Sequence, residues 1–208
     1  MGGSKGSRVI GIILAAGASR RMGRPKLLLP LDGKPLLQHA IDAAAASRLD
    51  GLIVVLGDRA EEVGAAIELP EGAREVVNER FAEGQSTSLR LGLRSAGEDI
   101  GSAAVLLGDQ PGVGAALIDR VLAAFEAGDR PVARPVYTVG ERRVPGHPVV
   151  LSREVWAEVE AVEGDRGAQR LLASRGDWLL EVAAEGAPPA DVDTPEDYEK
   201  AAGKPARQ

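Results

Sequence analysis

The segment from Leu14 to Lys26 holds residue types that can bind phosphate groups. It runs Leu14-Ala15-Ala16-Gly17-Ala18-Ser19 and then carries four cations, Arg20, Arg21, Arg24 and Lys26. Small residues after a strand leave backbone N–H groups unpaired and aligned, so this turn predicts a cradle for an anion such as a polyphosphate. Pro25 disfavours helical geometry just before it, and we expect Lys26 to hang from an extended loop. Backbone donors and mobile cations at one strand end predict a nucleoside triphosphate as the ligand.

The familiar phosphate-binding motifs do not fit this loop. A Walker A loop needs Gly-Lys-Ser/Thr at the start of a helix, whereas Gly23 is followed by Arg24-Pro25. A dinucleotide fingerprint needs three glycines at G-x-G-x-x-G spacing, and only Gly17 and Gly23 are present. The alternative interpretation is a basic surface loop that follows a core strand.

The elements that must position this loop alternate between apolar strands and helices. Strands are expected over 9–14, 52–56, 74–77, 103–107 and 178–182, with an extended segment over 130–136. Helices are expected from Pro35, over 60–67, from a Ser86 cap to 96, over 115–127 and from a Ser152 cap to 162, with a turn at Asp32-Gly33. This order predicts an α/β fold, a three-layer α/β/α, Rossmann-like architecture with a mostly parallel sheet and helices on both faces. Ligands of such sheets bind at the carboxyl ends of the strands, where both the Gly17 turn and Asp109 are expected.

Gly108-Asp109-Gln110-Pro111 follows the expected strand 103–107. An aspartate fixed at a strand end by flanking glycine and proline can offer a hard oxygen ligand to Mg²⁺. The alternative is an aspartate in an ordinary turn, which Gly-Asp alone would favour. Because the Gly17 loop is expected at the same edge, we interpret Asp109 as a metal ligand.

The string Asp191-Val192-Asp193-Thr194-Pro195-Glu196-Asp197 is explained in part by helix initiation. Thr194 is expected as the N-cap, Pro195 as the first helical residue and Asp197 as the partner in a capping box. Asp193 precedes the cap, so helix initiation does not account for it. We interpret Asp191 as a turn residue or as a partner of a metal ligand.

Two further segments carry polar groups with open interpretations. Gly84-Gln85-Ser86-Thr87-Ser88 opens a helix, whose free N–H groups can bind an anion or a base edge, although Ser86 could simply cap the helix. Gly146-His147-Pro148 holds one of two histidines, and a lone histidine is more often structural than catalytic. The other histidine, His39, is assigned no role.

These motifs resemble the MobA-like NTP transferase family, and within it the molybdenum cofactor cytidylyltransferase (MocA-like) branch. The matching strings are L-A-A-G-x-S-x-R-M-G-x-x-K, G-D-Q-P, G-x-S-x-S, G-H-P and D-x-D-T-P-E-D, in family order. Gly164–Arg170 is similar to a G-D-x-G-A-R segment of the branch but departs from it at Gln169, which leaves the role of Arg170 open. The family shares a glycosyltransferase-A-like fold with sugar-nucleotide pyrophosphorylases, and the resemblance implies that fold here.

The resemblance also implies an activity and a set of site residues. CMP would pass from CTP to the terminal phosphate of molybdenum-bound molybdopterin, and pyrophosphate would be released. Lys26 and Arg20 would act as catalytic cations together with Asp109, while Asp109 and Asp193 would hold Mg²⁺, with Mn²⁺ as a substitute. The nucleotide would contact Leu14, Ala15, Ala16, Gly17, Ser19, Arg20, Lys26, Gln85, Ser86, Ser88 and Gly108, and the acceptor would contact His147.

The base of the nucleotide substrate and two alternative functions stay open at this point. Relatives that transfer guanylyl groups carry L-A-G-G, whereas this chain has Ala16 in place of the first glycine. The methyl group of Ala16 should narrow the nucleotide site, which favours a pyrimidine base over the larger purine. The rivals are a guanylyl- or sugar/polyol-phosphate nucleotidyltransferase on the same fold, and a non-catalytic accessory protein that binds the cofactor. The G-H-P and Gly164–Arg170 segments argue against a sugar acceptor, and the intact Lys26, Asp109 and Asp193 argue against a pure carrier.

Composition bounds the remaining possibilities. The chain has 208 residues and 44% hydrophobic content, enough for one domain, which we expect over 8–202 between a leader (1–7) and a frayed tail (203–208). The net charge of −6 argues against a nucleic-acid partner, and the absence of cysteine excludes disulfides and thiol nucleophiles. With no membrane-spanning run or signal peptide, a cytoplasmic location is expected, where a molybdoenzyme or its chaperone would make transient contact.

Overall fold

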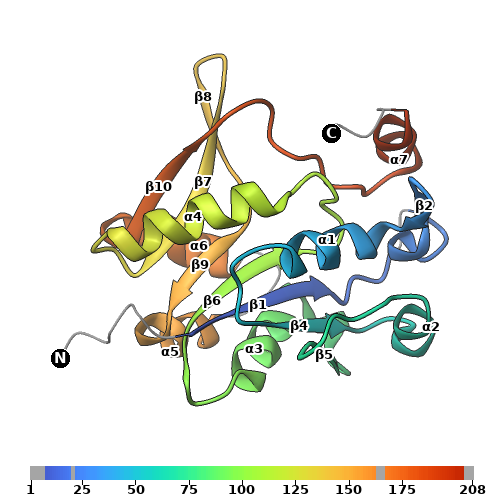
Figure 1. Cartoon of the computed structure of the whole chain (residues 1–208), viewed down its shortest axis with the longest axis horizontal. Helices are drawn as coiled ribbons and strands as arrows, with labels where there is room; N and C mark the ends of the chain where they lie inside the picture. The colour runs from blue at the N-terminus through green and yellow to red at the C-terminus, as the bar shows by residue number, and fades with distance from the viewer. Residues whose placement is uncertain (1–7, 20–21, 163–166, 204–208) are drawn as a thin grey trace.

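The computed structural model describes residues 8–19, 22–162 and 167–203, and it has a mixed sheet covered by helices on both faces (Figure 1). The strands of the sheet follow the order β10-β7-β9-β6-β1-β4-β5, with β8 paired to β7. They are β1 (Arg8–Ala15), β4 (Gly51–Leu56), β5 (Arg74–Val77), β6 (Ile100–Leu107), β7 (Val132–Val139), β8 (Arg142–Pro145), β9 (Val149–Ser152) and β10 (Leu179–Ala184). A separate hairpin joins β2 (Pro30–Leu31) to β3 (Lys34–Pro35).

The predicted α/β/α fold is confirmed, and β6, β1, β4 and β5 form a continuous block of parallel strands. β1 pairs in parallel with β4 and β6, β4 with β5, and β10 with β7. β9 is antiparallel to both β6 and β7, and β8 is antiparallel to β7. The carboxyl ends of β1 and β6 are therefore neighbours, as the sequence analysis required of the Gly17 turn and Asp109.

Two apolar cores lie on opposite faces of this sheet because successive strand residues point to opposite sides. On one face, Ile13 packs with α1 (Leu36–Ala45), α2 (Ala60–Ala65) and α4 (Ala115–Ala127). On the other face, Ile12 packs with α3 (Gln85–Ser95), α5 (Trp156–Glu160) and α6 (Gly167–Ser174). The last helix, α7 (Pro195–Ala202), lies beside the β2–β3 hairpin, where Tyr198 and Val192 pack with Leu31 and Leu36.

Helix α3 approaches the sheet closely at Gly92, which gives a prediction about stability. A Cβ atom on Gly92 would lie 2.5 Å from Ile12 Cγ2 and 3.3 Å from Val55 Cγ2, two stiff β-branched side chains. Alanine should gain about 1 kcal/mol in helix propensity, but overpacking costs roughly 1–3 kcal/mol. We expect Gly92→Ala to lower the free energy of unfolding by about 1 kcal/mol in urea titrations.

The matched control is Gly64→Ala in α2. There the added Cβ would meet the end of the Glu75 side chain at 2.8 Å, and that side chain can turn away. We expect no loss of stability in this variant. Equal stability of the Gly92→Ala and Gly64→Ala proteins would contradict the close packing of α3 on β1.

Several local predictions are confirmed and others are wrong. Helix 115–127 and strand 74–77 agree with α4 and β5 at both ends, and Asp32 and Gly33 both adopt positive φ in the hairpin turn. Ser86 does not cap α3: Gly84, with φ of 116°, is the N-cap, and Ser86 is buried inside the first turn. Pro35 is likewise an N-cap rather than the first helical residue.

The predicted helix from Ser152 to 162 is divided into a 3-10 turn (Arg153–Val155) and the short α5. Ser152 is the N-cap residue but makes no side-chain capping bond, and its backbone N–H ends β9 by donating to Pro131 O (2.8 Å). The predicted extended segment 130–136 overlaps β7, but its hairpin with β8 and the strand β9 were not predicted. The tip of that hairpin is exposed on both sides, so it lacks the alternation that identifies a half-buried strand.

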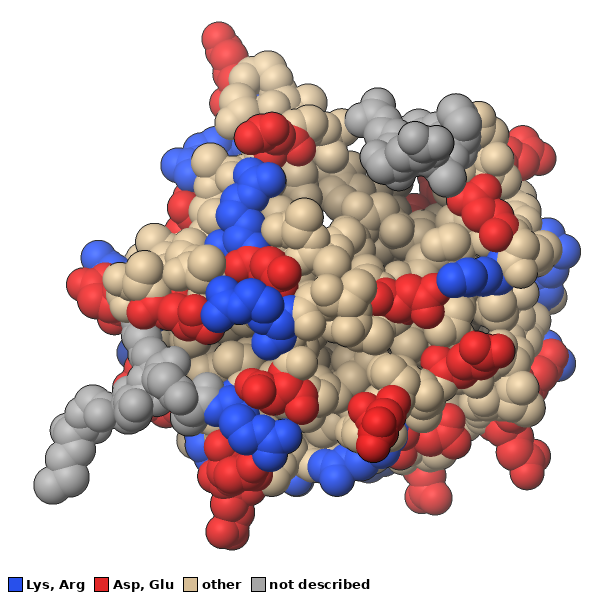
Figure 2. All heavy atoms as spheres, viewed as in Figure 1, with Lys and Arg blue, Asp and Glu red and all other residues tan. Residues whose placement is uncertain are grey.

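The surface and the ends of the chain add little to the site. On the face shown in Figure 2, acidic and basic side chains of the described residues are interspersed. Within the described ranges, no helix is long and apolar enough to cross a membrane. The expected leader and, apart from Gly203, the expected tail lie outside the described residues.

Candidate active site

The turn after β1 lines a cavity of about 410 Å³ at the carboxyl edge of the sheet. Its wall includes six consecutive residues from Leu14 to Ser19, together with Lys26, Gln85, Ser88, Asp109 and Asp193. A Cβ on Gly17 would meet nothing within 4 Å, so the backbone there faces open space. A large part of the predicted nucleotide site is thus gathered around one cavity.

Lys26 does not hang from an extended loop as predicted. Pro25 is extended, but Lys26 begins a 3-10 helix (Lys26–Leu28) and is buried. The Lys26 backbone N–H donates to Ser19 Oγ (3.1 Å), which ties the start of this helix to the turn after β1. The prediction failed because Pro25 restricts only the residue before it and leaves the following residues free to be helical.

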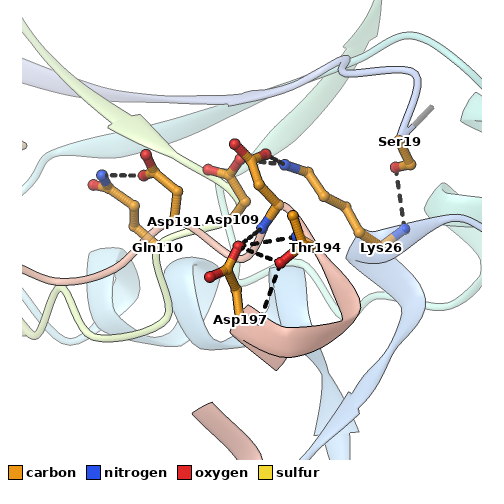
Figure 3. A network of polar contacts seen from close by, with 8 residues as sticks. Ser19, Lys26, Asp109, Gln110, Asp191, Thr194 and Asp197 are labelled. Carbon is orange, nitrogen blue, oxygen red and sulfur yellow. Dashed lines mark hydrogen bonds and ion pairs between the residues drawn. The ribbon is translucent and has the colours of Figure 1, made fainter. Parts of the chain in front are cut away.

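The Lys26 ammonium group brings two distant carboxylates together (Figure 3). Its Nζ lies 2.5 Å from Asp109 Oδ2 and 2.7 Å from Asp193 Oδ1. The three side chains come from the 3-10 helix after the β1 turn, from the end of β6 and from the segment before α7. Burial disfavours the charged lysine, but the ion pairs and hydrogen bonds to Asp109 and Asp193 outweigh it and raise the Lys26 pKa above its usual value.

Helix initiation fixes the position of Asp193, and the predicted capping box is confirmed. Thr194 is the N-cap of α7 and accepts a hydrogen bond from the Asp197 backbone N–H, while Asp197 Oδ2 accepts from Thr194 N–H (3.0 Å). The hydrogen bonds from Thr194 lower the pKa of Asp197. The Val192 backbone N–H donates to Asp109 O (3.0 Å), and this bond holds the two aspartate segments side by side.

Asp191 lies beside the two carboxylates and is paired with Gln110. The Gln110 side-chain amide donates to Asp191 Oδ1 (2.6 Å). Burial raises the pKa of Asp191, and the negative charges of Asp109 and Asp193 add to the shift. Asp191 therefore lies near the carboxylate pair, and its role as a turn residue or as a partner of a metal ligand stays a prediction.

The predicted residues of α3 divide between the cavity and the interior. Gln85 and Ser88 line the cavity, and Ser88 Oγ accepts from Asn78 Nδ2 (2.9 Å). Ser86 and Gly108 do not line this cavity. Gly108 instead donates its N–H to Leu14 O (3.0 Å), and a Cβ on it would lie 2.8 Å from Leu37 Cδ1, so it serves close packing.

The sequence analysis missed the wall opposite the turn. Phe81, Ala82 and Gly84 also line the cavity. A Cβ on Gly57 would lie 2.7 Å from Ala16 Cβ and 2.8 Å from Phe81 Cβ, so this glycine lets the two walls approach. Gly84 belongs to the G-x-S-x-S string, but no motif marked Phe81 and Ala82 in the sequence.

A second cavity of about 510 Å³ adjoins the first. The two share Leu14, Gln85, Leu107, Asp109 and Asp193 in their walls. Apart from the shared residues, Arg134, His147 and Asp191 contribute polar side chains to the wall of the second cavity. The rest of its wall is mainly aliphatic and is formed by Leu89, Val105, Val149, Leu151, Val159 and Leu172. Arg134 was not predicted.

Buried polar atoms at this second cavity have no partner within the described residues. They are His147 Nδ1 and Arg134 Nε in its wall, and Gln110 Oε1 on the residue that binds Asp191. Burial lowers the pKa of His147 to about 4, the charge of Arg134 adds to this, and Asp109 opposes it. His147 is therefore a neutral hydrogen-bonding group near pH 7.

This pKa predicts a pH-dependent contribution to stability. Below the unfolded pKa of about 6.5, the unfolded chain binds a proton that folded His147 does not accept until near pH 4. Lowering the pH from 6.5 to 5 should therefore destabilise the parent protein by roughly 1–2 kcal/mol relative to His147→Gln. Urea unfolding at each pH measures this, with His39→Gln as the control, and parallel curves for the parent and His147→Gln would contradict it.

Two predicted features fall outside what the structure describes. Arg20 is one of them, and the Gly164-Asp165-Arg166 part of the Gly164–Arg170 segment is the other. Arg170 belongs to α6 by its backbone, and its role stays open.

The two carboxylates at the junction of the cavities suit a divalent cation whose remaining ligands are phosphate oxygens of the substrates. Within the described ranges, no group of three or more histidine, cysteine or acidic side chains could hold a metal by itself. Mg²⁺ is usually held by one or two carboxylates, with water and substrate phosphates completing its coordination. Asp109 and Asp193 match that requirement, since both carboxylates converge on one cation and face a cavity lined by a candidate phosphate-binding turn.

A cavity at the carboxyl ends of parallel strands is the usual ligand site of open α/β proteins. A family model for the MobA-like NTP transferase domain matches residues 11–179, which span β1 to the start of β10. The chain belongs to the MobA-like NTP transferase family.

The chain is also similar over most of its length to several individual proteins, whose names do not agree on one reaction. The chain is 33% identical to nicotine blue oxidoreductase of Paenarthrobacter nicotinovorans (90% of this chain, 93% of the relative). It is 32% identical to the purine catabolism protein PucB of Bacillus subtilis (92% and 94%). The solved structure of Rv0371c from Mycobacterium tuberculosis superposes with a TM-score of 0.85 at 34% identity (95% and 99%). A complex of Rv0371c with manganese has also been solved, with a TM-score of 0.81 (94% and 98%).

Proposed function

We propose that this member of the family is a Mg²⁺-dependent cytidylyltransferase that acts on molybdenum-bound molybdopterin. The observation that carries the proposal is that two adjoining cavities share Asp109 and Asp193 at their junction. A transferase of this kind needs two substrate sites that meet where the new bond forms. The manganese complex of Rv0371c supports a divalent cation in the family fold.

The first cavity is the proposed nucleotide site. Backbone N–H groups from Ala16 to Ser19 would bind the phosphates, and the wall formed by Ala16, Phe81 and Ala82 would hold the base. The close approach of Ala16 and Phe81 at Gly57 favours a pyrimidine over the larger purine. We therefore propose CTP as the nucleotide.

The second cavity is the proposed acceptor site. Its aliphatic wall favours a flat ring system over a sugar or polyol, whose many hydroxyl groups would lose their hydrogen bonds to water there. The neutral His147 and the partly buried Arg134 would bind polar atoms at the edge of that ring system. This chemistry matches a pterin better than a sugar phosphate.

The reaction follows from the junction of the two cavities. An oxygen of the acceptor's terminal phosphate attacks the α-phosphorus of CTP, the bond from that phosphorus to the bridging oxygen breaks, and pyrophosphate leaves with the electron pair. Asp109 and Asp193 would hold Mg²⁺, which would neutralise charge on the reacting phosphates. Lys26 and Arg20 would neutralise charge on the α-phosphate and the leaving group, so catalysis rests on positioning and electrostatics.

The test is pyrophosphate release from CTP and from GTP, with Mg²⁺ and molybdenum-bound molybdopterin, and mass spectrometry of the product. We expect release from CTP and formation of molybdopterin cytosine dinucleotide. Faster release from GTP, or release only with sugar or polyol phosphates, would contradict the proposal in its base or in its acceptor. Molybdopterin binding without any pyrophosphate would indicate a carrier instead.

The same measurement separates the proposal from the activity named in one relative, nicotine blue oxidoreductase. Hydride or electron transfer releases no pyrophosphate. A redox change of a substrate without nucleotide consumption would therefore contradict the transferase proposal.

A further inference from the structure

The Lys26 ammonium group occupies the place where the two carboxylates of the junction converge. It lies within 2.7 Å of oxygens from both Asp109 and Asp193. The side chains of Lys26, Asp109 and Asp193 are 10%, 21% and 32% exposed, so water screens their charges only in part. The lysine is therefore strongly held in this position.

This position conflicts with the proposed use of the same carboxylates. A hard divalent cation binds carboxylate oxygens at roughly 2.0–2.6 Å, so at the point where the two carboxylates converge it would compete with Lys26 for Asp109 Oδ2 and Asp193 Oδ1. Two cations this close together would also repel each other strongly in a partly buried site. The lysine and a divalent cation therefore compete for the place where these two carboxylates converge.

Lys26 has a second anionic partner within reach once the first cavity is filled. Its side chain lies in the wall of that cavity with the turn that contains Gly17 and Ser19. Its backbone is fixed through Ser19 Oγ, but its four-carbon stem can rotate. A triphosphate bound at the turn would offer the ammonium group several charged oxygens in place of the carboxylates.

We propose that Lys26 keeps the Asp109–Asp193 pair closed to divalent cations until a triphosphate in the first cavity draws its ammonium group away. The inference rests on the proposed role of the two aspartates as metal ligands. Lys26 then has two successive partners, first the carboxylates and later the phosphates. Because coupling between two binding sites is reciprocal, triphosphate should strengthen metal binding and metal should strengthen triphosphate binding.

The first test measures Mn²⁺ affinity without any nucleotide, from the electron paramagnetic resonance signal of free Mn²⁺. We expect Lys26→Met to bind Mn²⁺ at least about tenfold more tightly than the parent protein, because it removes the competing charge and keeps the volume. Lys26→Arg keeps the charge and should bind as weakly as the parent. Lys34→Met removes an exposed lysine that lines neither cavity and should change little.

The second test measures binding of inorganic triphosphate by calorimetry in metal-free buffer with EDTA. We expect Lys26→Met to bind it at least about tenfold more weakly than the parent, because the cation that turns to the phosphates is missing. Unchanged Mn²⁺ affinity in Lys26→Met, or unchanged triphosphate affinity, would overturn the inference. So would Mn²⁺ binding by Lys26→Arg as tight as that by Lys26→Met.

The parent protein gives a third test that needs no folded Lys26→Met variant. The ammonium nitrogen resonance of Lys26, assigned by its loss in Lys26→Arg, should shift when inorganic triphosphate is added without metal. An unmoved resonance at saturating triphosphate would overturn the inference. None of these measurements uses CTP or molybdopterin, so they are independent of the pyrophosphate assay that tests the proposed reaction.

Discussion

Replacing Asp109 by alanine is expected to abolish pyrophosphate release, a loss of at least about a thousandfold, while the fold is retained. Among the residues that the structure describes, Asp109 and Asp193 are the two carboxylates that converge on Lys26 at the junction of the two cavities. With one carboxylate left, the proposed metal site would keep a single protein ligand. The phosphates of the two substrates would then lose most of the charge neutralisation that the reaction needs.

The fold should survive because Asp109 is partly exposed and Lys26 keeps its ion pair with Asp193. The measurement is pyrophosphate release at saturating CTP, acceptor and Mg²⁺, together with circular dichroism to check folding. Asp129→Ala is the matched control, since that side chain is 96% exposed and should leave the activity unchanged. An active Asp109→Ala enzyme would refute the assignment of Asp109 as a metal ligand.

Replacing Lys26 by alanine is expected to lower kcat at least about tenfold at saturating Mg²⁺. The substitution removes the buried cation that lies between the carboxylate pair and the turn after β1. In the proposed reaction this cation neutralises charge on the α-phosphate and on the departing pyrophosphate. The loss should therefore appear in turnover even where metal binding becomes tighter.

The matched control for Lys26→Ala is Lys34→Ala, which removes a lysine whose side chain is 55% exposed and ion-paired with Asp42. Its exposed ion pair should contribute little, and kcat should stay at the parent level. Saturating Mg²⁺ keeps differences in metal affinity out of the comparison. Unchanged kcat in Lys26→Ala would contradict a transition-state role for Lys26.

The sequence alone determined the elements whose signals lie within a few neighbouring residues. The apolar runs gave β1, β4 and β6 to within a few residues, and Thr194, Pro195 and Asp197 specified the capping box of α7. Apolar periodicity and helix caps act over one or two turns, so they can be found without knowing the fold. Ser86 shows the limit, because a serine near a helix start also fits a buried position behind a glycine N-cap.

The tertiary structure decided how the charges meet, and in particular that Lys26 pairs directly with both aspartates. Lys26 lies 83 residues from Asp109 and 167 residues from Asp193, and no local pattern specifies that all three converge. Their meeting depends on the pairing of β1 with β6 and on the Val192–Asp109 hydrogen bond. The lysine therefore lies between the carboxylates rather than on an extended loop. Arg134 and the aliphatic wall of the second cavity also emerged only from strand order, because their side chains become neighbours when β6, β7 and β9 are assembled.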